Sequence, residues 1–270
     1  MTSTIKGIAQ LIFSALALSS IPCHAEVDMG SLAVSPLSNH SASSPIPDGF
    51  IVGGVGLYGQ SRYQAESNTT MAIPGFLYFG SQFLFLGDRV RYYVYNQDAL
   101  SAYLYGRVRM GNLNPADNAA FAGMNKRKWE LEAGLGGSYI TPYAVLSTRA
   151  ASDVTGTSNG QELLLWADFP ISRDNWLIMP GAGVFIRSAN FSNYYFGGVS
   201  ASEATATRPA WNTGTTVDVG FSLITSYRFN KNWLGTFSAN YELYDSSIRN
   251  SPLVQHRGEL YVIAGLGYMW

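Results

Sequence analysis

The chain has 270 residues and a formal net charge of −1, and only 13% of its residues are charged. This balance excludes a nucleic-acid-binding face, which would need an excess of Lys and Arg. A mean hydropathy of +0.03, with no apolar run of spanning length after the N-terminus, excludes a helical membrane protein. An aromatic content of 14% and 28 glycines suit a β-barrel, whose alternating strands hide their hydrophobic face from such averages.

The N-terminus, residues 1–25, predicts a secretory signal peptide. The stretch 8–21 is apolar, and Cys23 and Ala25 place small residues at the two positions that a signal peptidase reads. Cleavage after Ala25 would remove the one cysteine of the chain, which excludes a disulfide scaffold in the mature protein. A lipoprotein is disfavoured because Pro22 stands where a small flexible residue is expected.

Residues 26–48 predict a flexible periplasmic tether. Serines alternate there with Pro36, Pro45 and Pro47, and apolar periodicity is absent. Two interpretations remain open: a solvated tail with no special role, and a segment that binds a partner.

From residue 49 onward, strands and turns alternate. A period of two in side-chain character, interrupted by Gly, Pro, Asn and Asp, predicts about twelve strands. They are Phe50–Tyr63, Met71–Phe79, Gln82–Leu86, Arg89–Tyr95, Ala99–Met110, Trp129–Tyr139, Tyr143–Ala150, Gln161–Phe169, Trp176–Arg187, Thr215–Phe229, Trp233–Tyr244 and Gly258–Trp270. The count depends most on the Met71–Tyr95 region, where Pro74 indicates a bulge or an edge-like irregularity.

The connections alternate in length. Short turns are expected at Gly80, Asn96, Thr141, Pro170 (with Ile171–Asp174 as the turn) and Asn230, and long loops at Gln64, Gly111, Ser152, Ala189 and Asp245. Short periplasmic turns and long external loops are typical of outer-membrane barrels. We therefore predict an all-β, antiparallel transmembrane β-barrel over residues 49–270. A soluble β-sandwich is the alternative, but its second face would be charged rather than rich in Gly, Ser and Tyr.

The last strand, Gly258–Trp270, carries the clearest membrane signal. Leu266, Tyr268 and Trp270 share one face, and the chain ends on an aromatic residue. We predict that this strand closes against the first, with Tyr268 and Trp270 in the interfacial aromatic girdle. The same three residues are interpreted as the C-terminal assembly signal for the barrel-assembly machinery. The alternative is a sandwich edge strand that stops at a tryptophan.

Charged residues are expected to point into the lumen. Arg107 and Arg109 on one strand and Glu130 and Glu132 on the next predict a cross-strand charge ladder. Asp218 and Arg228 belong to the same predicted set, and Asp168, Arg187 and Glu242 are candidates to extend it. The ladder could be a constriction that selects solutes, or a structural network inside the lumen, which we favour.

Catalytic, metal and cofactor sites are not predicted. His256 is the one histidine near the predicted barrel, and neither Ser251 nor Asp245 nearby is distinguished from other serines and carboxylates. Metal binding lacks a ligand cluster, and the glycines Gly53, Gly54 and Gly56 lie inside a strand with no helix after it, which excludes a dinucleotide fingerprint.

Several loop motifs carry a family resemblance. They are Asp153-Val154-Thr155-Gly156, Gly160-Gln161-Glu162, the run from Ser188 to Gly197, Glu203-Ala204 and Arg208-Pro209-Ala210-Trp211, with Gly123-Met124, Tyr227-Arg228, Asn232-Trp233 and Ser251-Pro252 in matching order. Together they resemble the MltA-interacting protein/OmpV family over most of Gly49–Trp270. The tyrosine-rich run is the most specific part.

This resemblance implies an outer-membrane β-barrel in a Gram-negative bacterium. In the best-known member it implies a scaffold that links a lytic transglycosylase to a murein synthase. Both enzymes are therefore expected periplasmic partners, and outer-membrane lipid is a further expected partner. Other members are described as surface antigens, adhesins or porin-like proteins.

Three functions therefore stay open. We favour a non-enzymatic scaffold for peptidoglycan-remodelling enzymes that docks them through the tether and the short turns. A small-solute channel is the second. The third is a surface adhesin that acts through the loop 189–214, with Tyr194, Tyr195 and Phe196 as contacts, unless these aromatics fold inward and brace the loop.

Overall fold

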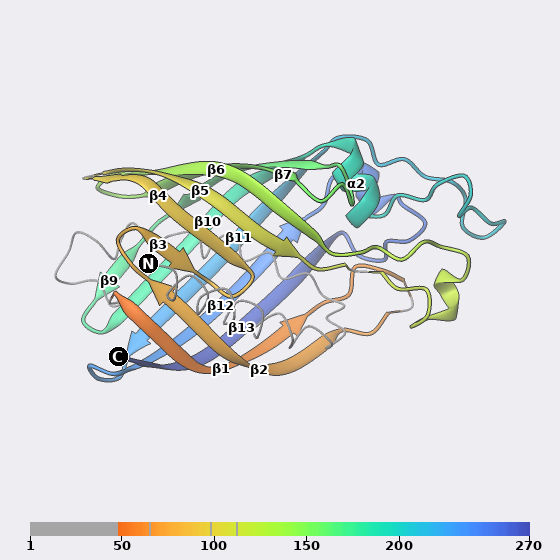
Figure 1. Cartoon of the computed structure of the whole chain (residues 1–270). Helices are drawn as coiled ribbons and strands as arrows, with labels where there is room; N and C mark the ends of the chain where they lie inside the picture. The colour runs from red at the N-terminus through yellow and green to blue at the C-terminus, as the bar shows by residue number, and fades with distance from the viewer. Residues whose placement is uncertain (1–47, 65, 98, 112) are drawn as a thin grey trace, which may run out of the picture.

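The computed structural model describes residues 48–270 except 65, 98 and 112, so the predicted signal peptide and nearly all of the predicted tether lie outside the described residues. The described chain forms one antiparallel sheet that closes into a barrel (Figure 1). Its strands are β1 (Gly49–Gly59), β2 (Thr69–Phe79), β3 (Phe83–Phe85), β4 (Arg89–Gln97), β5 (Leu100–Arg109), β6 (Glu130–Ile140), β7 (Val145–Asp153), β8 (Gln161–Asp168), β9 (Ile171–Arg173), β10 (Trp176–Arg187), β11 (Thr216–Arg228), β12 (Trp233–Leu243) and β13 (Gly258–Met269).

The barrel has twelve strand positions within the described residues, as predicted. β8 and the short β9 pair with successive parts of the same edge of β10, so together they occupy one position. β13 closes the barrel against β1 through nine register pairs, from Ile51↔Met269 to Gly59↔Tyr261. The predicted closure of the last strand on the first is confirmed. No helix in the described part of the chain is long and apolar enough to cross a membrane.

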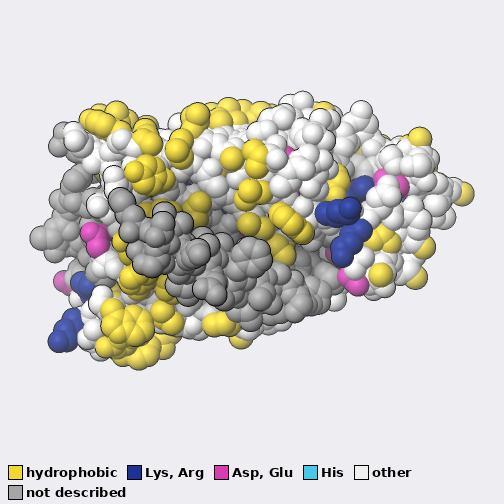
Figure 2. Space-filling model, viewed as in Figure 1, with side chains coloured by type: hydrophobic (Ala, Val, Ile, Leu, Met, Phe, Trp, Pro, Cys, Tyr) yellow, Lys and Arg dark blue, Asp and Glu magenta, His cyan; other side chains and the backbone are white. Residues whose placement is uncertain are grey.

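Side chains alternate between lipid and lumen because successive residues of a strand point to opposite faces. On β5, for example, Leu100 and Leu104 are exposed while Tyr103 and Arg107 are buried. On the face shown in Figure 2, most charged side chains lie toward the two ends of the barrel, with hydrophobic and uncharged side chains between them. This distribution suits a wall embedded in lipid.

The two ends differ. The long connections, the helix α2 (Ala189–Tyr195), the short helix α3 (Ser246–Arg249) and the 3₁₀ turn η3 (Ala119–Phe121) lie at one end, which we call the long-loop end (Figure 1). The chain terminus Trp270 and the tight turns lie at the other, the short-turn end. Aromatic rings meet there, including Trp233 with Tyr268 at 5.4 Å and Tyr268 with Trp270 at 5.1 Å between centroids. Clustered aromatic side chains are typical of the aromatic belt at a membrane–water interface.

Two predicted boundaries are wrong. The predicted turn Ile171–Asp174 contains strand β9, because Ile171–Arg173 still pairs with Trp176–Ile178 of β10. The predicted strand Phe50–Tyr63 ends at Gly59, and the residues after it leave the wall. The Arg62 side chain turns into the lumen, and Tyr63 forms an isolated bridge with Val254.

The Met71–Tyr95 region departs most from a regular wall. β3 has only three residues, and its hairpin with β4 turns back at Gly87-Asp88, where Gly87 has a φ of +82°. Register between β1 and β2 is unbroken through Pro74, so the predicted bulge is absent from this ladder. The edge-like character is real, however, because β3 covers only Tyr78 and Phe79 on the other side of β2.

Candidate functional site

A buried charge network fills the lumen at the long-loop end. Its first half joins β5, β6, β7 and β8, whose inward-facing positions are set by the register of the sheet. Arg109 donates a short hydrogen bond to Glu132 and lies 3.6 Å from Glu162 (Nη2–Oε2). Arg149 donates to the other oxygen of Glu162 at 2.5 Å. All four side chains are almost completely shielded from solvent.

Arg187 on β10 is the centre of the second half. Its Nε donates to Glu162 at 2.9 Å, and its Nη1 donates to Asp218 at 2.5 Å and to Glu242. One guanidinium therefore balances carboxylates from β8, β11 and β12. A buried cation with this many partners is well satisfied, and its loss would leave Asp218 and Glu242 without this cation in a low-dielectric interior, whereas Glu162 keeps Arg149.

A third set of contacts ties this layer to the other side of the barrel. Arg62 donates to Glu259 on β13 at 2.5 Å and to the Tyr244 hydroxyl at 2.8 Å. The ring of Phe196 lies between two guanidinium groups, 4.0 Å from Arg62 and 4.1 Å from Arg187. Stacked cations of this kind are stabilised by the ring quadrupole, more so when desolvated. The network thus crosses the barrel from β5 to β13.

Helix α2 brings the aromatic side chains into the lumen. Ser188 caps its first turn, since its hydroxyl accepts from the backbone N–H of Phe191 and also from that of Gln161 at 2.9 Å. Phe191 lies 4.5 Å beneath the guanidinium of Arg109, and Tyr195 is fully buried. Figure 1 shows α2 at the long-loop end of the barrel, where its Phe191 contacts Arg109 of the charge network.

Not every residue of the predicted charge ladder joins this network. Arg107 bonds to Asp88 in the β3–β4 turn at 3.1 Å. Glu130 does reach the network, through an ion pair with Arg109 at 4.0 Å (Nε–Oε1). Arg228 sits at the short-turn end of β11, ten residues after Asp218, which is roughly 33 Å of strand at about 3.3 Å per residue. The structure therefore does not bring Arg228 to the other charges.

The predicted loop contacts are placed mainly inside the molecule. Tyr195 and Phe196 are buried, so neither ring is presented at the surface, and bracing of the loop describes their position. Tyr194 is half-buried, and its hydroxyl accepts from the backbone N–H of Lys128 at 2.8 Å. A surface function for Tyr195 and Phe196 is thus contradicted by their burial.

Four members of the network were missed in the sequence: Arg62, Arg149, Glu162 and Glu259. Strand alternation does signal Glu162 and Glu259, because both lie on the same face as predicted inward residues. Arg149 lies on a strand whose facing the pattern left unassigned. Arg62 had no signal, since it follows the end of β1 and reaches the lumen only through the path of a loop.

Ion pairs and hydrogen bonds to backbone atoms connect the long loops. Glu203 accepts from Arg127 Nη1 at 3.0 Å and from the backbone N–H groups of Asn125 and Ser200. Burial alone would raise the pKa of Glu203, but these donors lower it to about 2. Arg208 donates to the carbonyls of Ala120 and Ala122, which ties the loop after β10 to the loop after β5.

Residues considered for catalysis hold these loops. Ser251 donates its hydroxyl to the carbonyl of Gly197 at 2.6 Å, and the Asp245 carboxylate caps α3 by accepting from the Ser247 N–H at 2.8 Å. Among the described residues, no group of three or more His, Cys, Asp or Glu side chains could hold a metal ion.

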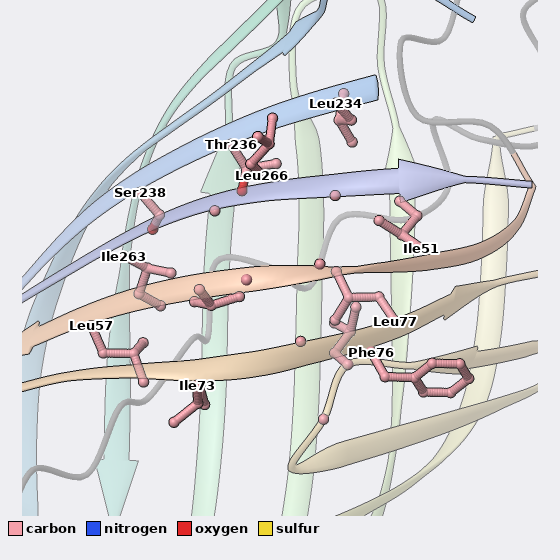
Figure 3. Close-up of a pocket in the computed structure, with 18 of the residues that line it drawn as sticks. Ile51, Leu57, Ile73, Phe76, Leu77, Leu234, Thr236, Ser238, Ile263 and Leu266 are labelled. Carbon is pink, nitrogen blue, oxygen red and sulfur yellow. The ribbon is translucent and has the colours of Figure 1, made fainter. Parts of the chain in front are cut away.

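The part of the lumen beside β1, β2, β12 and β13 is mainly apolar. A cavity of about 410 Å³ lies against β1, β2, β12 and β13 (Figure 3). Ile51, Leu57, Ile73, Leu77 and Ile263 line it on this side, and Leu177, Met179 and Ile224 line it from β10 and β11. We call it the apolar chamber. Its volume is within the range of ligand pockets, about 300–1,000 Å³.

Comparison with known proteins identifies the family. Residues 52–270 match the model of a family described as MltA-interacting protein MipA. The chain belongs to this family. The resemblance inferred from the loop motifs is thereby confirmed.

Relatives in the family include the MltA-interacting protein of Escherichia coli K12, which is 26% identical over 220 residues, 80% of this chain and 87% of that protein. OmpV of Vibrio cholerae is 30% identical over 148 residues, 54% of this chain and 56% of its own length. Omp26La of Vibrio anguillarum is 29% identical over 146 residues, so the match spans about half of that relative. These relatives are named as interacting or outer-membrane proteins, and with the closed barrel they place the chain in the outer membrane.

Among solved structures, the translocator domain of the autotransporter NalP from Neisseria meningitidis is similar at a TM-score of 0.43 and 12% identity. The match covers 88% of this chain and 93% of that one.

The loop motifs that carry the resemblance to the MipA family have a structural role here. Ser188 caps α2, Phe196 is clamped between two arginines, and Glu203 and Arg208 join the loops. Trp211 adds a further bond from its indole N–H to the Ser247 carbonyl at 2.8 Å. The motifs on which the resemblance rests therefore include residues that close the long-loop end.

Proposed function

We propose that this protein is a non-enzymatic outer-membrane scaffold for peptidoglycan-remodelling enzymes, with a lytic transglycosylase as a partner. The observation that carries the proposal is the filled long-loop end, where buried ion pairs and the rings of α2 occupy the lumen. Such an interior favours a structural role of the barrel over transport. The partner class rests on the name of the Escherichia coli relative, MltA-interacting protein.

Outer-membrane barrels keep their short turns in the periplasm, so docking would occur at the short-turn end. The turn between β6 and β7 presents Tyr143, whose side chain is 84% exposed. Thr141 holds this turn rigid, because its hydroxyl accepts from the Ala144 N–H at 2.8 Å and donates to the Ala144 carbonyl. A rigid, exposed aromatic is the kind of side chain that anchors protein interfaces.

Co-purification from crosslinked cell envelopes tests the scaffold. The wild-type protein is expected to retain a lytic transglycosylase, and Tyr143→Ser is expected to weaken this retention. Phe229→Ser is the matched control, because Phe229 is an exposed aromatic in another turn at the same end. Deletion of residues 26–48 measures the contribution of the tether. Absence of any cell-wall enzyme from the wild-type sample would contradict the proposal.

Planar-bilayer recordings separate the scaffold from a channel. Conductance is expected to be absent or small because the charge network and α2 obstruct the lumen. A large, stable conductance of the purified wild-type barrel would favour transport of small solutes instead.

A further inference from the structure

The wall of the barrel is incomplete beside β2. On one side, β2 pairs with β1 through eleven register pairs, from Gly49↔Phe79 to Gly59↔Thr69. On the other side it pairs with β3 only at Tyr78↔Phe85 and Phe79↔Leu84. Within the described residues, no strand pairs with the remaining part of that edge. On the long-loop side of the β3–β4 hairpin, a gap therefore separates β2 from the end of β5.

An open edge is unusual in a membrane, because unpaired backbone groups at membrane depth are tolerated only where they are buried in protein or line a water-filled cavity. Pro74 lies in the middle of the open part of β2. Since its register with β1 is unbroken, its ring nitrogen, which has no hydrogen to donate, faces the gap. Proline on an edge discourages pairing with an additional strand. The edge is thus built to stay open rather than to receive a further strand.

The apolar chamber lies directly behind this gap. Ile73 and Leu77 line it from the inner face of β2, whereas Phe76 and Val108 also line it although their positions in the register face outward. A cavity lined by both faces of the wall passes through the wall. It is therefore continuous with the lipid-facing surface of the barrel.

Three glycines on the inner face line the chamber. Gly53 is paired with Gly75 on β2 and with Gly267 on β13, which gives a row of three positions without side chains. A Cβ at Gly267 would approach Ile51 Cγ2 to 2.4 Å, and one at Gly75 would approach Val55 Cγ2 to 2.8 Å. Side chains at these two positions would overlap Ile51 and Val55, so the glycines allow those residues to pack along the inner face.

The chamber offers little to a charged ligand. Asp88 and Arg107 are the charged residues in its lining, and they bond to each other at 3.1 Å. Nearly all the other lining side chains are aliphatic, aromatic, glycine or hydroxyl-bearing. Its chemistry suits a flexible hydrocarbon chain, which is also what surrounds the opening in the bilayer.

We propose that the gap between β2 and β5 is a lateral entrance, and that the apolar chamber binds an acyl chain of a membrane lipid. The chain enters sideways from the bilayer, and its headgroup stays at the membrane surface. The lining of the chamber is continuous with the lipid-facing surface of the outer wall. This site is independent of the scaffold function.

Photocrosslinking in lipid nanodiscs tests the site. The wild-type protein is reconstituted in phosphatidylcholine and phosphatidylglycerol, doped with phosphatidylcholine that carries a diazirine near the end of one acyl chain. Inner-face residues such as Ile73, Leu77 and Ile263 are expected to be labelled, and mass spectrometry of the peptides locates the adducts. The same lipid with the diazirine on its headgroup is expected to leave these residues unlabelled.

Occlusion of the chamber provides the decisive variant. Thr236→Phe places a ring in the chamber and is expected to lower labelling of Ile73 and Leu77 roughly tenfold. Thr225→Phe makes the same change on the outward face of β11 and is expected to leave labelling unchanged. Heat-modifiable migration on gels verifies that each variant is folded. If Thr236→Phe does not fold, Ser238→Leu occupies the same chamber with a smaller side chain.

Adducts confined to outward-facing residues would overturn the proposal, because that pattern is ordinary lipid around a closed wall. Equal inner-face labelling of Thr236→Phe and wild type would overturn it as well. Neither result bears on co-purification with cell-wall enzymes, so the two proposals fail separately.

Discussion

The lumen contains two regions that the same strand alternation builds from opposite chemistry. At the long-loop end, Arg62, Arg109 and Arg187 are buried with their carboxylates beneath α2. On the β12, β13, β1 and β2 side, the inward residues that line the apolar chamber are aliphatic, glycine or hydroxyl-bearing. Both sets point inward for the same geometric reason. The period of a strand sets the facing of a residue, but its neighbours across the barrel decide whether it closes the lumen or leaves a cavity.

The largest effect is expected from the centre of the charged region. Arg187→Leu leaves Glu162, Asp218 and Glu242 without their shared cation and should cost about 3–5 kcal/mol of unfolding free energy. Urea unfolding of the detergent-solubilised barrel measures it. Arg173→Leu in the exposed strand β9 is the control and should change stability by about 0.5 kcal/mol or less. Equal losses in both variants would show that the network does not stabilise the barrel.

Removal of the ring between the arginines should come next. Phe196→Ala leaves a cavity and removes two cation–π contacts, with an expected loss of about 3 kcal/mol. Phe196→Leu keeps most of the volume, so the difference between the two variants separates packing from the guanidinium contacts. Protease cleavage in the loop 189–214 should rise in parallel. A fully stable Phe196→Ala variant would contradict a clamping role.

A matched pair of threonines compares the two regions directly. Thr216 is fully buried at the charged end and shares a hydrogen bond with Ser192 at 2.8 Å, whereas Thr236 faces the apolar chamber. Thr216→Val should cost about 1 kcal/mol because it strands the Ser192 hydroxyl. Thr236→Val should be nearly neutral. Identical unfolding midpoints for the two variants would show that loss of the hydroxyl costs the same stability in both regions, which contradicts the prediction.

The smallest effect concerns the loops alone. Because the pKa of Glu203 is lowered to about 2, its carboxylate stabilises the loop contacts above the ordinary glutamate pKa of about 4.3, and this stabilisation is lost as the pH falls toward 2. Limited proteolysis with an acid-active protease should show the wild-type loops opening over this range. Glu203→Gln should be more open at neutral pH and should vary less with pH. A pH response identical to wild type would exclude Glu203 as its source.

The sequence by itself determined the fold class, the twelve strand positions, the closure of β13 on β1 and the family. It did so because period-two alternation, turn residues and loop motifs are local signals. It also placed Arg109, Glu132 and Asp218 on the inner face, where the structure finds them buried.

Only the tertiary structure decided which inward residues meet. Arg62 reaches the lumen through a loop, Arg228 lies too far along β11 to join the network, and Phe196 lies between two arginines instead of at the surface. The opening beside β2 depends on where a three-residue strand stops. Such relations depend on strand register and loop path across the closed barrel, which no local pattern encodes.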